Sequence, residues 1–96
     1  MNTDPSLLVL ASLANGAKHG YAMMEDIERF SGVRLGPGTL YGAITRLEEQ
    51  KWIAPVPSKD RRRPYKLTAS GMAHLKQQLG ALDRVISTAS ERLKYA

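Results

Sequence analysis

Apolar residues follow three short helical patterns, one extended pattern and one long heptad pattern along this chain. The first, Leu7 to Ala14, is apolar around most of its circumference, which indicates burial on two sides. Asp4-Pro5 before it provides a capping carboxylate and a proline suited to the first helical turn, and Asn15-Gly16 after it provides a stop. We therefore expect a first helix from Pro5, with one side available to a second subunit.

Two further helices are predicted in the first half of the chain. The second runs from about Tyr21 to Ser31, with the side chains near its inward face being Tyr21, Met24, Ile27 and Phe30. The third starts at Gly36-Pro37-Gly38-Thr39 and continues to about Gln50. At about 100° per residue, its apolar side chains fall on one side and its small or hydrogen-bonding side chains roughly opposite. The first set is Leu40, Ala43, Ile44 and Leu47, and the second is Tyr41, Gly42, Thr45 and Glu49. This pattern indicates one buried face and one face available for a groove.

The segment after the third helix has the pattern of a β-hairpin. Residues 52–57 read as an edge strand, because its two prolines cannot donate hydrogen bonds to a central ladder. Residues 64–67 read as the antiparallel return, and residues 58–63 as an exposed tip.

A long last helix is predicted from Ala69 to about Lys94, with Thr68 as its N-cap. Its apolar residues alternate at spacings of three and four, which predicts a coiled-coil seam that Gly80, off the seam, weakens by about 1 kcal/mol. The seam consists of Met72, Leu75, Leu79, Leu82, Ile86, Ala89 and Leu93. With Leu7 and Leu10 of the first helix, these are the residues expected at a dimer interface.

The formal net charge of +5 is concentrated in the hairpin. Residues 51–66 hold one acid, Asp60, and six basic residues, whereas the basic and acidic residues elsewhere balance. The six are Lys51, Lys59, Arg61, Arg62, Arg63 and Lys66. A basic loop beside an amphipathic helix is typical of a winged helix-turn-helix, and it indicates duplex DNA as the partner.

Length and composition limit the remaining possibilities. Ninety-six residues form one small domain that buries little surface, which oligomerisation would relieve. The chain has no Cys, so disulfides and thiolate zinc sites are excluded. Its start does not resemble a secretory signal and its longest apolar stretch is too short to cross a bilayer, so we expect a soluble cytoplasmic protein with no membrane partner.

The third helix is the candidate recognition helix, and the hairpin tip is the candidate wing. Outward residues of the helix can reach phosphates or base edges, and Gly42 lets its backbone approach the groove floor; the alternative is a solvated face on which Gly42 serves packing. Glu48 and Glu49 oppose contact with phosphate, so only the first two turns can enter a groove. The expected DNA contacts are Tyr21, Thr39, Tyr41, Gly42, Thr45, Arg46, Lys59, Arg61, Arg62 and Arg63.

Catalytic and metal chemistry have little support in the sequence. His19 and His74 lie in different segments without a nucleophile, a phosphate-binding loop or metal-ligand spacing, so we predict no enzyme, no cofactor and no metal site. His19 is interpreted as a cap or packing residue and His74 as a surface residue. Trp52 is interpreted as a core residue that anchors the helix to the wing, or else as an aromatic wall for a planar effector at the dimer interface.

Several linked motifs resemble the PadR-like transcriptional regulators, especially the short members with a single C-terminal helix. They are Lys18-His19-Gly20-Tyr21, Gly36-Pro37-Gly38-Thr39-Leu40-Tyr41 with Arg46-Leu47-Glu48, and Tyr65-Lys66-Leu67-Thr68-Ala69-Ser70-Gly71. Two positions depart from that family. Gly42 stands where the family usually has Pro, and Lys51 stands where it usually has Gly. Lys51 would then have to adopt a left-handed conformation, at a cost of about 1 kcal/mol, or else the helix would have to end differently.

The resemblance implies a homodimeric repressor whose first and last helices form the dimer and whose winged helices read a palindromic operator. Members of the family respond to phenolic acids, drugs, other small molecules or protein partners. We therefore expect a mostly α fold with a small β-hairpin, divided into a winged helix-turn-helix over residues 1–68 and a dimerisation helix over residues 69–96. The alternatives are a dimer that senses a small molecule between its subunits, and a winged-helix module that binds proteins.

Overall fold

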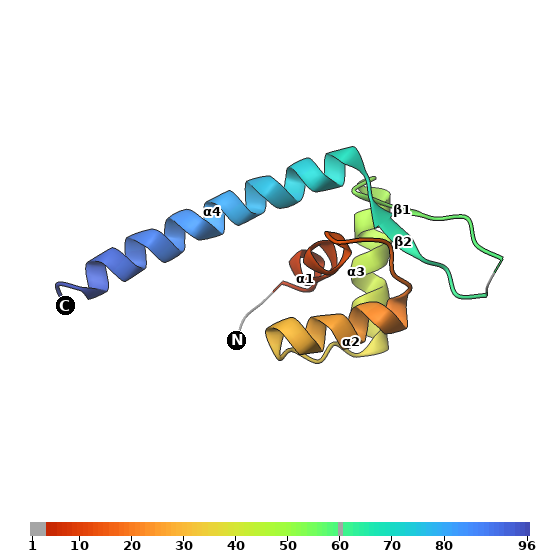
Figure 1. Cartoon of the computed structure of the whole chain (residues 1–96), viewed down its shortest axis with the longest axis horizontal. Coiled ribbons are helices and arrows are strands. Elements are labelled where there is room, and N and C mark those ends of the chain that lie inside the picture. The colour runs from red at the N-terminus through yellow and green to blue at the C-terminus, as the bar shows by residue number, and fades with distance from the viewer. Residues whose placement is uncertain (1–3, 60) are drawn as a thin grey trace.

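The computed structural model describes residues 4–59 and 61–96. Figure 1 shows a small helical body, a hairpin that projects from it, and a long C-terminal helix that extends to the other side. The elements in chain order are α1 (Pro5–Leu13), α2 (Gly20–Ser31), α3 (Pro37–Glu49), β1 (Ile53–Pro55), β2 (Tyr65–Leu67) and α4 (Ala69–Leu93). This order confirms the predicted mostly α architecture with one hairpin.

The helix starts form as the capping residues predict. Asp4 accepts the N–H of Ser6 at 3.1 Å, and Pro5 occupies the first turn of α1. His19 caps α2 by accepting the N–H of Ala22 on Nδ1 at 3.3 Å. Thr68 caps α4 by accepting the N–H of Gly71 at 3.0 Å. Each cap satisfies an amide that the helix itself leaves unpaired, and this fixes where the helix begins.

The turn from α3 into β1 depends on Lys51. Its φ is 62°, so of the two expected outcomes it adopts the left-handed conformation in place of glycine. This conformation costs a residue with a Cβ about 1 kcal/mol. The Lys51 N–H donates to the carbonyl of Glu48 at 2.9 Å, and the Trp52 N–H donates to the carbonyl of Leu47 at 3.0 Å. These bonds close the end of α3 and direct the chain into the hairpin.

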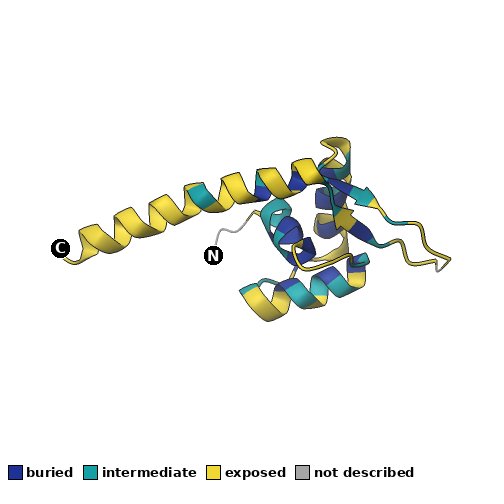
Figure 2. Ribbon diagram, turned by 45° about the horizontal axis from the view of Figure 1, so that its top comes forward, coloured by how far each residue is buried: buried dark blue, intermediate teal, exposed yellow. Residues whose placement is uncertain are grey.

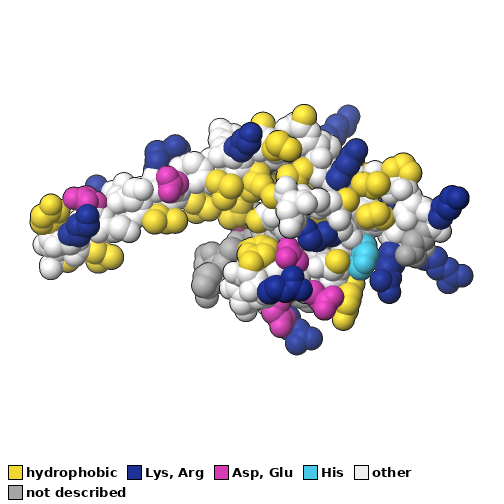
Figure 3. All heavy atoms as spheres, in the orientation of Figure 1, with side chains coloured by type: hydrophobic (Ala, Val, Ile, Leu, Met, Phe, Trp, Pro, Cys, Tyr) yellow, Lys and Arg dark blue, Asp and Glu magenta, His cyan; other side chains and the backbone are white. Residues whose placement is uncertain are grey.

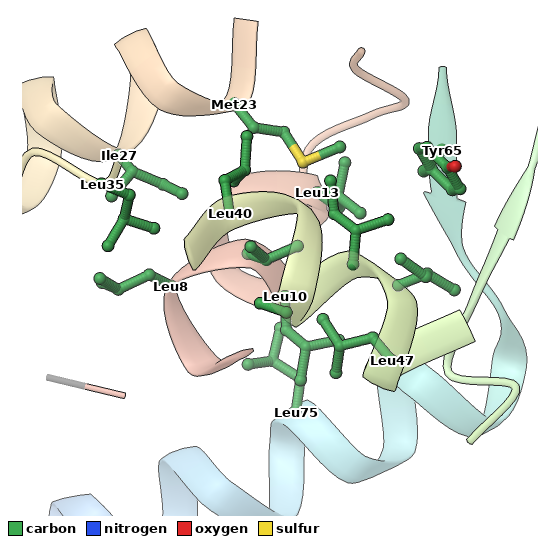
Figure 4. Packing of buried hydrophobic residues seen from close by; sticks show 14 residues of the cluster. Leu8, Leu10, Leu13, Met23, Ile27, Leu35, Leu40, Leu47, Tyr65 and Leu75 are labelled. Atoms are coloured by element: carbon green, nitrogen blue, oxygen red, sulfur yellow. The ribbon is translucent and has the colours of Figure 1, made fainter. Parts of the chain in front are cut away.

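The hydrophobic core surrounds α1, as Figure 4 shows. Val9 is fully buried and Leu10 is 2% exposed, because α2, α3, α4 and β2 all pack against their helix. This confirms the prediction that α1 is covered on more than one side. Leu75 of α4 joins the same core and is 5% exposed. Leu10 and Leu75 were both expected at a dimer interface, but their surfaces are already covered within one chain, so little of either is left for a partner.

The predicted inward face of α2 was wrong at both ends. Tyr21 is 60% exposed and Phe30 is 50% exposed, whereas Met23 and Ile27 are fully buried. Residues at an uninterrupted spacing of three fall about 60° behind a full turn at each step, so Phe30, nine residues after Tyr21, lies about 180° around the helix from it. The two aromatic rings therefore cannot face the same core.

The hairpin pairs its strands in antiparallel register, with Ile53 opposite Leu67 and Pro55 opposite Tyr65. The N–H of Val56 donates to the carbonyl of Pro64 at 2.8 Å beyond the strand end. Lys18 exchanges two backbone hydrogen bonds with Tyr65, of 3.0 and 3.1 Å, on the other side of β2. The bridge ties the hairpin to the connection between α1 and α2, so β1 is the outer edge.

The start of α4 lies against the hairpin. A Cβ added at Gly71 would overlap the carbonyl oxygen of Trp52 and lie 2.7 Å from its carbonyl carbon, so only glycine fits there. After Leu75, almost all of α4 is exposed (Figure 2). Within the described ranges, no helix combines the length and apolar character needed to cross a membrane.

Candidate nucleic-acid interface

The two predicted faces of α3 are confirmed. The buried residues of the helix are Leu40, Ala43, Ile44 and Leu47. Thr39, Tyr41, Thr45 and Arg46 are exposed, and Gly42 between them is half-buried. Since the buried face is held in the core, the exposed face is fixed in orientation and can enter a groove as a rigid unit.

The first turn of α3 is open to anions. Its N-cap is Gly36, which provides no side-chain hydrogen bond, and Pro37 follows at the first helical position. The amides of Gly38 and Thr39 therefore have no capping side chain, and both residues are exposed. The partial positive charge of a helix N-terminus and its free amides favour a phosphate oxygen.

Two side chains on the exposed face of α3 are held by the helix itself. The Thr45 hydroxyl donates to the carbonyl of Tyr41 at 2.9 Å, so its methyl group and its oxygen lone pairs are what remain for a ligand. The guanidinium of Arg46 lies beside Gly42, because Nη1 would be 3.5 Å from a Cβ at position 42. Gly42 thus leaves room along the helix for the side chain of Arg46.

Tyr41 connects α3 to the start of α2. A Cβ at Gly20 would overlap the Tyr41 hydroxyl and lie 2.8 Å from Cζ, so the ring packs directly over this glycine. Tyr41 nevertheless remains 50% exposed. The structure therefore supports both interpretations of its role, because the ring packs against a helix start while part of the side chain is accessible.

The wing, residues 56–64 between the two strands, carries the basic side chains away from the body, as Figure 3 shows. Lys59, Arg61, Arg62 and Arg63 are all exposed. Asp60, the one acid of the segment, lies outside the described residues. Side chains with this charge and exposure can contact sugar–phosphate backbone or enter a minor groove.

A groove of about 530 Å³ joins the wing to the helices. Its lining residues come from the α2 start, from α3, from the wing and from β2. They are His19, Gly20, Tyr21, Tyr41, Arg61, Arg62, Arg63 and Tyr65. The structure thus brings five of the predicted DNA contacts into one concave surface, with Thr39, Thr45 and Arg46 on the adjoining face of α3.

The sequence of this chain matches a known protein family. The model of the transcriptional regulator PadR-like family matches residues 9–77, which is more than half of the sequence. The chain belongs to the PadR-like family of transcriptional regulators. Regulators of this family are DNA-binding proteins and not enzymes, which agrees with the expectation from the sequence.

One relative of this PadR-like chain shares close sequence similarity. An uncharacterized 37.1 kDa protein in transposon TN4556 of Streptomyces fradiae is 45% identical over 82 residues, which are 85% of this chain and 24% of that protein. The chain therefore spans about a quarter of that relative's length.

Solved structures support the winged-helix fold. A PadR family transcription regulator from Clostridium difficile R20291 superposes with a TM-score of 0.85 and 22% identity, covering 95% of this chain and 99% of that one. F93 from STIV, a winged-helix DNA-binding protein, superposes with a TM-score of 0.76 and 17% identity, covering 83% and 88%. At these identities the likeness establishes the fold alone.

Trp52 and His74 form a second candidate site on the PadR-like domain. Their rings stack with centroids 3.6 Å apart and planes 9° apart. Both residues are half-buried, so His74 is not the plain surface residue that was expected. The pair lines a groove of about 310 Å³ with Leu7 of α1, Arg46 of α3 and Gln50, the C-cap of α3.

Three residues that line the groove between the wing and the helices were not among the predicted contacts, namely His19, Gly20 and Tyr65. His19 was interpreted as a cap or packing residue, and the cap is confirmed, but its side chain also lines the groove. Tyr65 was placed only in the return strand, and it lies 9% exposed beneath the wing. The available signal was the position of His19 next to Gly20 and Tyr21 at a helix start. No cluster of three metal-ligating side chains occurs in the described part of the chain.

Proposed function

We propose that this PadR-like protein binds duplex DNA as a homodimer and represses transcription from a palindromic operator. One observation carries the proposal: the wing arginines and Tyr41 of the exposed α3 face line the same groove. A duplex that receives α3 in its major groove would then meet the wing on its backbone. The protein would act in the cytoplasm, beside the DNA that it regulates.

In this arrangement α3 reads bases and the wing holds phosphates. Thr39, Thr45 and Arg46 are exposed on α3, where a helix in the major groove contacts base edges. The three wing arginines and Tyr21 line the groove, where they would meet the DNA backbone and add affinity without selecting a sequence. Sequence preference and salt dependence therefore arise from different elements and can be measured separately.

The homodimer proposal rests on the unpartnered apolar side of α4. Most of its predicted seam residues are well exposed although they are apolar. Their exposed fractions are 48% for Met72, 49% for Leu79, 42% for Leu82, 61% for Ile86 and 73% for Leu93. A row of this kind at heptad spacing is covered by a second helix in coiled coils. The half-buried Leu7 of α1 is the other residue proposed for this interface.

A second candidate function is the sensing of a planar small molecule. The groove beside the Trp52–His74 stack favours it, because aromatic rings form one wall and the half-buried Leu7 supplies apolar surface. The groove also includes Arg46, which lies on the recognition helix. A ligand held there would affect DNA binding through that helix, and it would lie near the second subunit of the proposed dimer.

The decisive experiment is a selection of bound fragments from random duplex DNA, run with the wild-type protein and with a variant in which Arg61, Arg62 and Arg63 are all Ala. We expect the wild type to enrich an inverted repeat whose half-sites are about one helical turn apart. The variant should enrich the same motif with lower recovery. A wild-type protein that enriches no motif and binds no duplex would favour the protein-interaction module instead.

A further inference from the structure

His19 has a defined proton arrangement in the folded protein. Its Nδ1 accepts the N–H of Ala22 at 3.3 Å as the cap of α2. A ring nitrogen that accepts a hydrogen bond carries no proton, so the neutral imidazole must carry its proton on Nε2. The cap therefore selects one tautomer and makes the opposite side of the ring a donor.

The surroundings of His19 make that donor available to an anion. The side chain is half-buried and lines the groove between α2 and the wing. Within the described residues, Nε2 has no protein acceptor, and the charged side chains that line the groove are the three wing arginines. The remaining polar side chains around it are tyrosines, which can also donate hydrogen bonds. Such a set of donors fits a phosphate oxygen.

The backbone holds His19 close to the wing. Lys18, directly before it, is joined to Tyr65 of β2 by hydrogen bonds in both directions. The Lys18 ammonium itself is directed elsewhere, because it donates to the Ser12 carbonyl and the Asn15 side chain. The position of the imidazole relative to the hairpin is therefore fixed before any DNA binds, which avoids part of the entropy cost of forming a contact.

We propose that His19 contacts a DNA phosphate, donating from Nε2 as a neutral imidazole while Nδ1 caps α2. This inference deepens the proposed function and rests on it. The His19 side chain would then have two roles, as the cap of α2 and as a contact with a DNA phosphate. The two roles can be separated by substitution. A neutral donor adds a hydrogen bond but no charge, so it contributes affinity without releasing a counterion.

Two substitutions separate the roles. In His19→Asn, the short amide keeps an oxygen near the position of Nδ1 and caps well, but it has nothing at the position of Nε2. In His19→Gln, the longer amide can place a donor near the position of Nε2, but it is a poorer cap. Thermal unfolding measures the cap, and fluorescence anisotropy with a labelled duplex, titrated at several salt concentrations, measures the phosphate contact.

We expect His19→Asn to unfold near the wild-type temperature and to bind duplex DNA about tenfold more weakly per half-site, evenly across sequences. Its slope of log affinity against log salt should equal that of the wild type. His19→Gln should unfold at a lower temperature and lose less affinity than His19→Asn at a temperature where both are folded. In the free wild-type protein, the nitrogen shifts of the ring should show a proton on Nε2 and none on Nδ1.

Equal affinity of wild type and His19→Asn would overturn the phosphate contact while leaving DNA binding intact. A salt slope that falls by about one unit per His19 removed would overturn the neutral donor, because it would indicate a charged imidazole. Failure of the wild-type protein to bind any duplex would overturn the proposed function and this inference together.

Discussion

The indole of Trp52 and the imidazole of His74 lie in parallel contact, with their centroids 3.6 Å apart. Trp52 follows α3 and His74 lies about one turn into α4, so the stack joins the turn after α3 to the helix proposed for dimerisation. The stack is therefore a direct side-chain contact between these two segments of the fold.

Replacing His74 with Ala should lower the free energy of unfolding by about 1 kcal/mol, since an aromatic pair contributes about that much beyond its buried area. Denaturant unfolding followed by circular dichroism checks it. The emission of Trp52, the only tryptophan of the chain, should also change in the folded state. His74→Phe keeps a flat ring and serves as the control, with near wild-type stability. A loss as large in His74→Phe would show that stacking is not the source.

Replacing Gly71 or Gly80 with alanine should change the stability of the protein in opposite directions, although both residues lie in α4. At Gly71 a Cβ would overlap the Trp52 carbonyl, which is backbone and cannot rotate away, so Gly71→Ala should cost about 3 kcal/mol. At Gly80 a Cβ would meet only the end of the Arg84 side chain at 3.8 Å, so Gly80→Ala should add about 1 kcal/mol of helix stability. Thermal unfolding of both variants measures the contrast, and a stable Gly71→Ala protein would contradict the close approach.

The wing should act through charge. If Arg61, Arg62 and Arg63 contact phosphates, replacing one of them by Ala should reduce the slope of log affinity against log salt by about 0.9 units per subunit. In a dimer each replacement occurs twice. The triple variant should therefore lose about five units from the slope of log affinity against log salt. Arg29, an exposed cation near the end of α2, provides a control whose removal should leave the slope unchanged. An unaltered slope in the triple variant would show that the wing does not touch DNA.

Charges placed on the apolar side of α4 should dissociate the dimer. Leu79→Asp with Leu82→Asp would bury four unpaired carboxylates between two subunits, at a cost of several kcal/mol. Sedimentation should then show a monomer, with specific operator binding lost because two half-sites are no longer held together. Gln77→Asp with Ser87→Asp adds the same charge to exposed positions off the seam and should remain dimeric. A dimer that survives the leucine substitutions would contradict the seam.

Thr45 should select bases through its methyl group. Its hydroxyl donates to the Tyr41 carbonyl, so the side chain presents its methyl group. That group would pack against the methyl group of a thymine. Thr45→Val keeps that methyl group and should retain the preferred base, whereas Thr45→Ala should change it at symmetric positions of the repeat. Operators selected in parallel for the three proteins give the comparison. A uniform loss of affinity with unchanged preference in Thr45→Ala would show that this position contacts no base.

The local signals of the sequence predicted the fold well. Capping residues such as Asp4 and Thr68 act within one helical turn, so they fix helix starts wherever the helices later pack. The left-handed conformation of Lys51 was one of two outcomes that the sequence left open for the end of α3, and the structure has it. These features depend on the covalent neighbourhood, which a sequence displays directly.

Contacts between distant segments were harder to predict. A stack between Trp52 and His74 requires the approach angle of α4 on the hairpin, which no periodicity encodes. The burial of Leu75 inside one chain, rather than in a seam, depends on how far the core of the body extends along α4. The presence of His19 in the wing groove depends in the same way on the bridge between Lys18 and Tyr65. In each case the tertiary arrangement decided which of two plausible roles a residue takes.

The prolines of the hairpin limit pairing between its outer edge and a strand of another molecule. Because the Val56 N–H points inward to Pro64, the neighbouring backbone nitrogens of Pro55 and Pro57 face the outer edge, where neither has a hydrogen to donate. An edge without these donors is a poor template for a further strand from another molecule. Copies of this protein that lie close together would therefore not extend the hairpin into an intermolecular β-sheet at this edge.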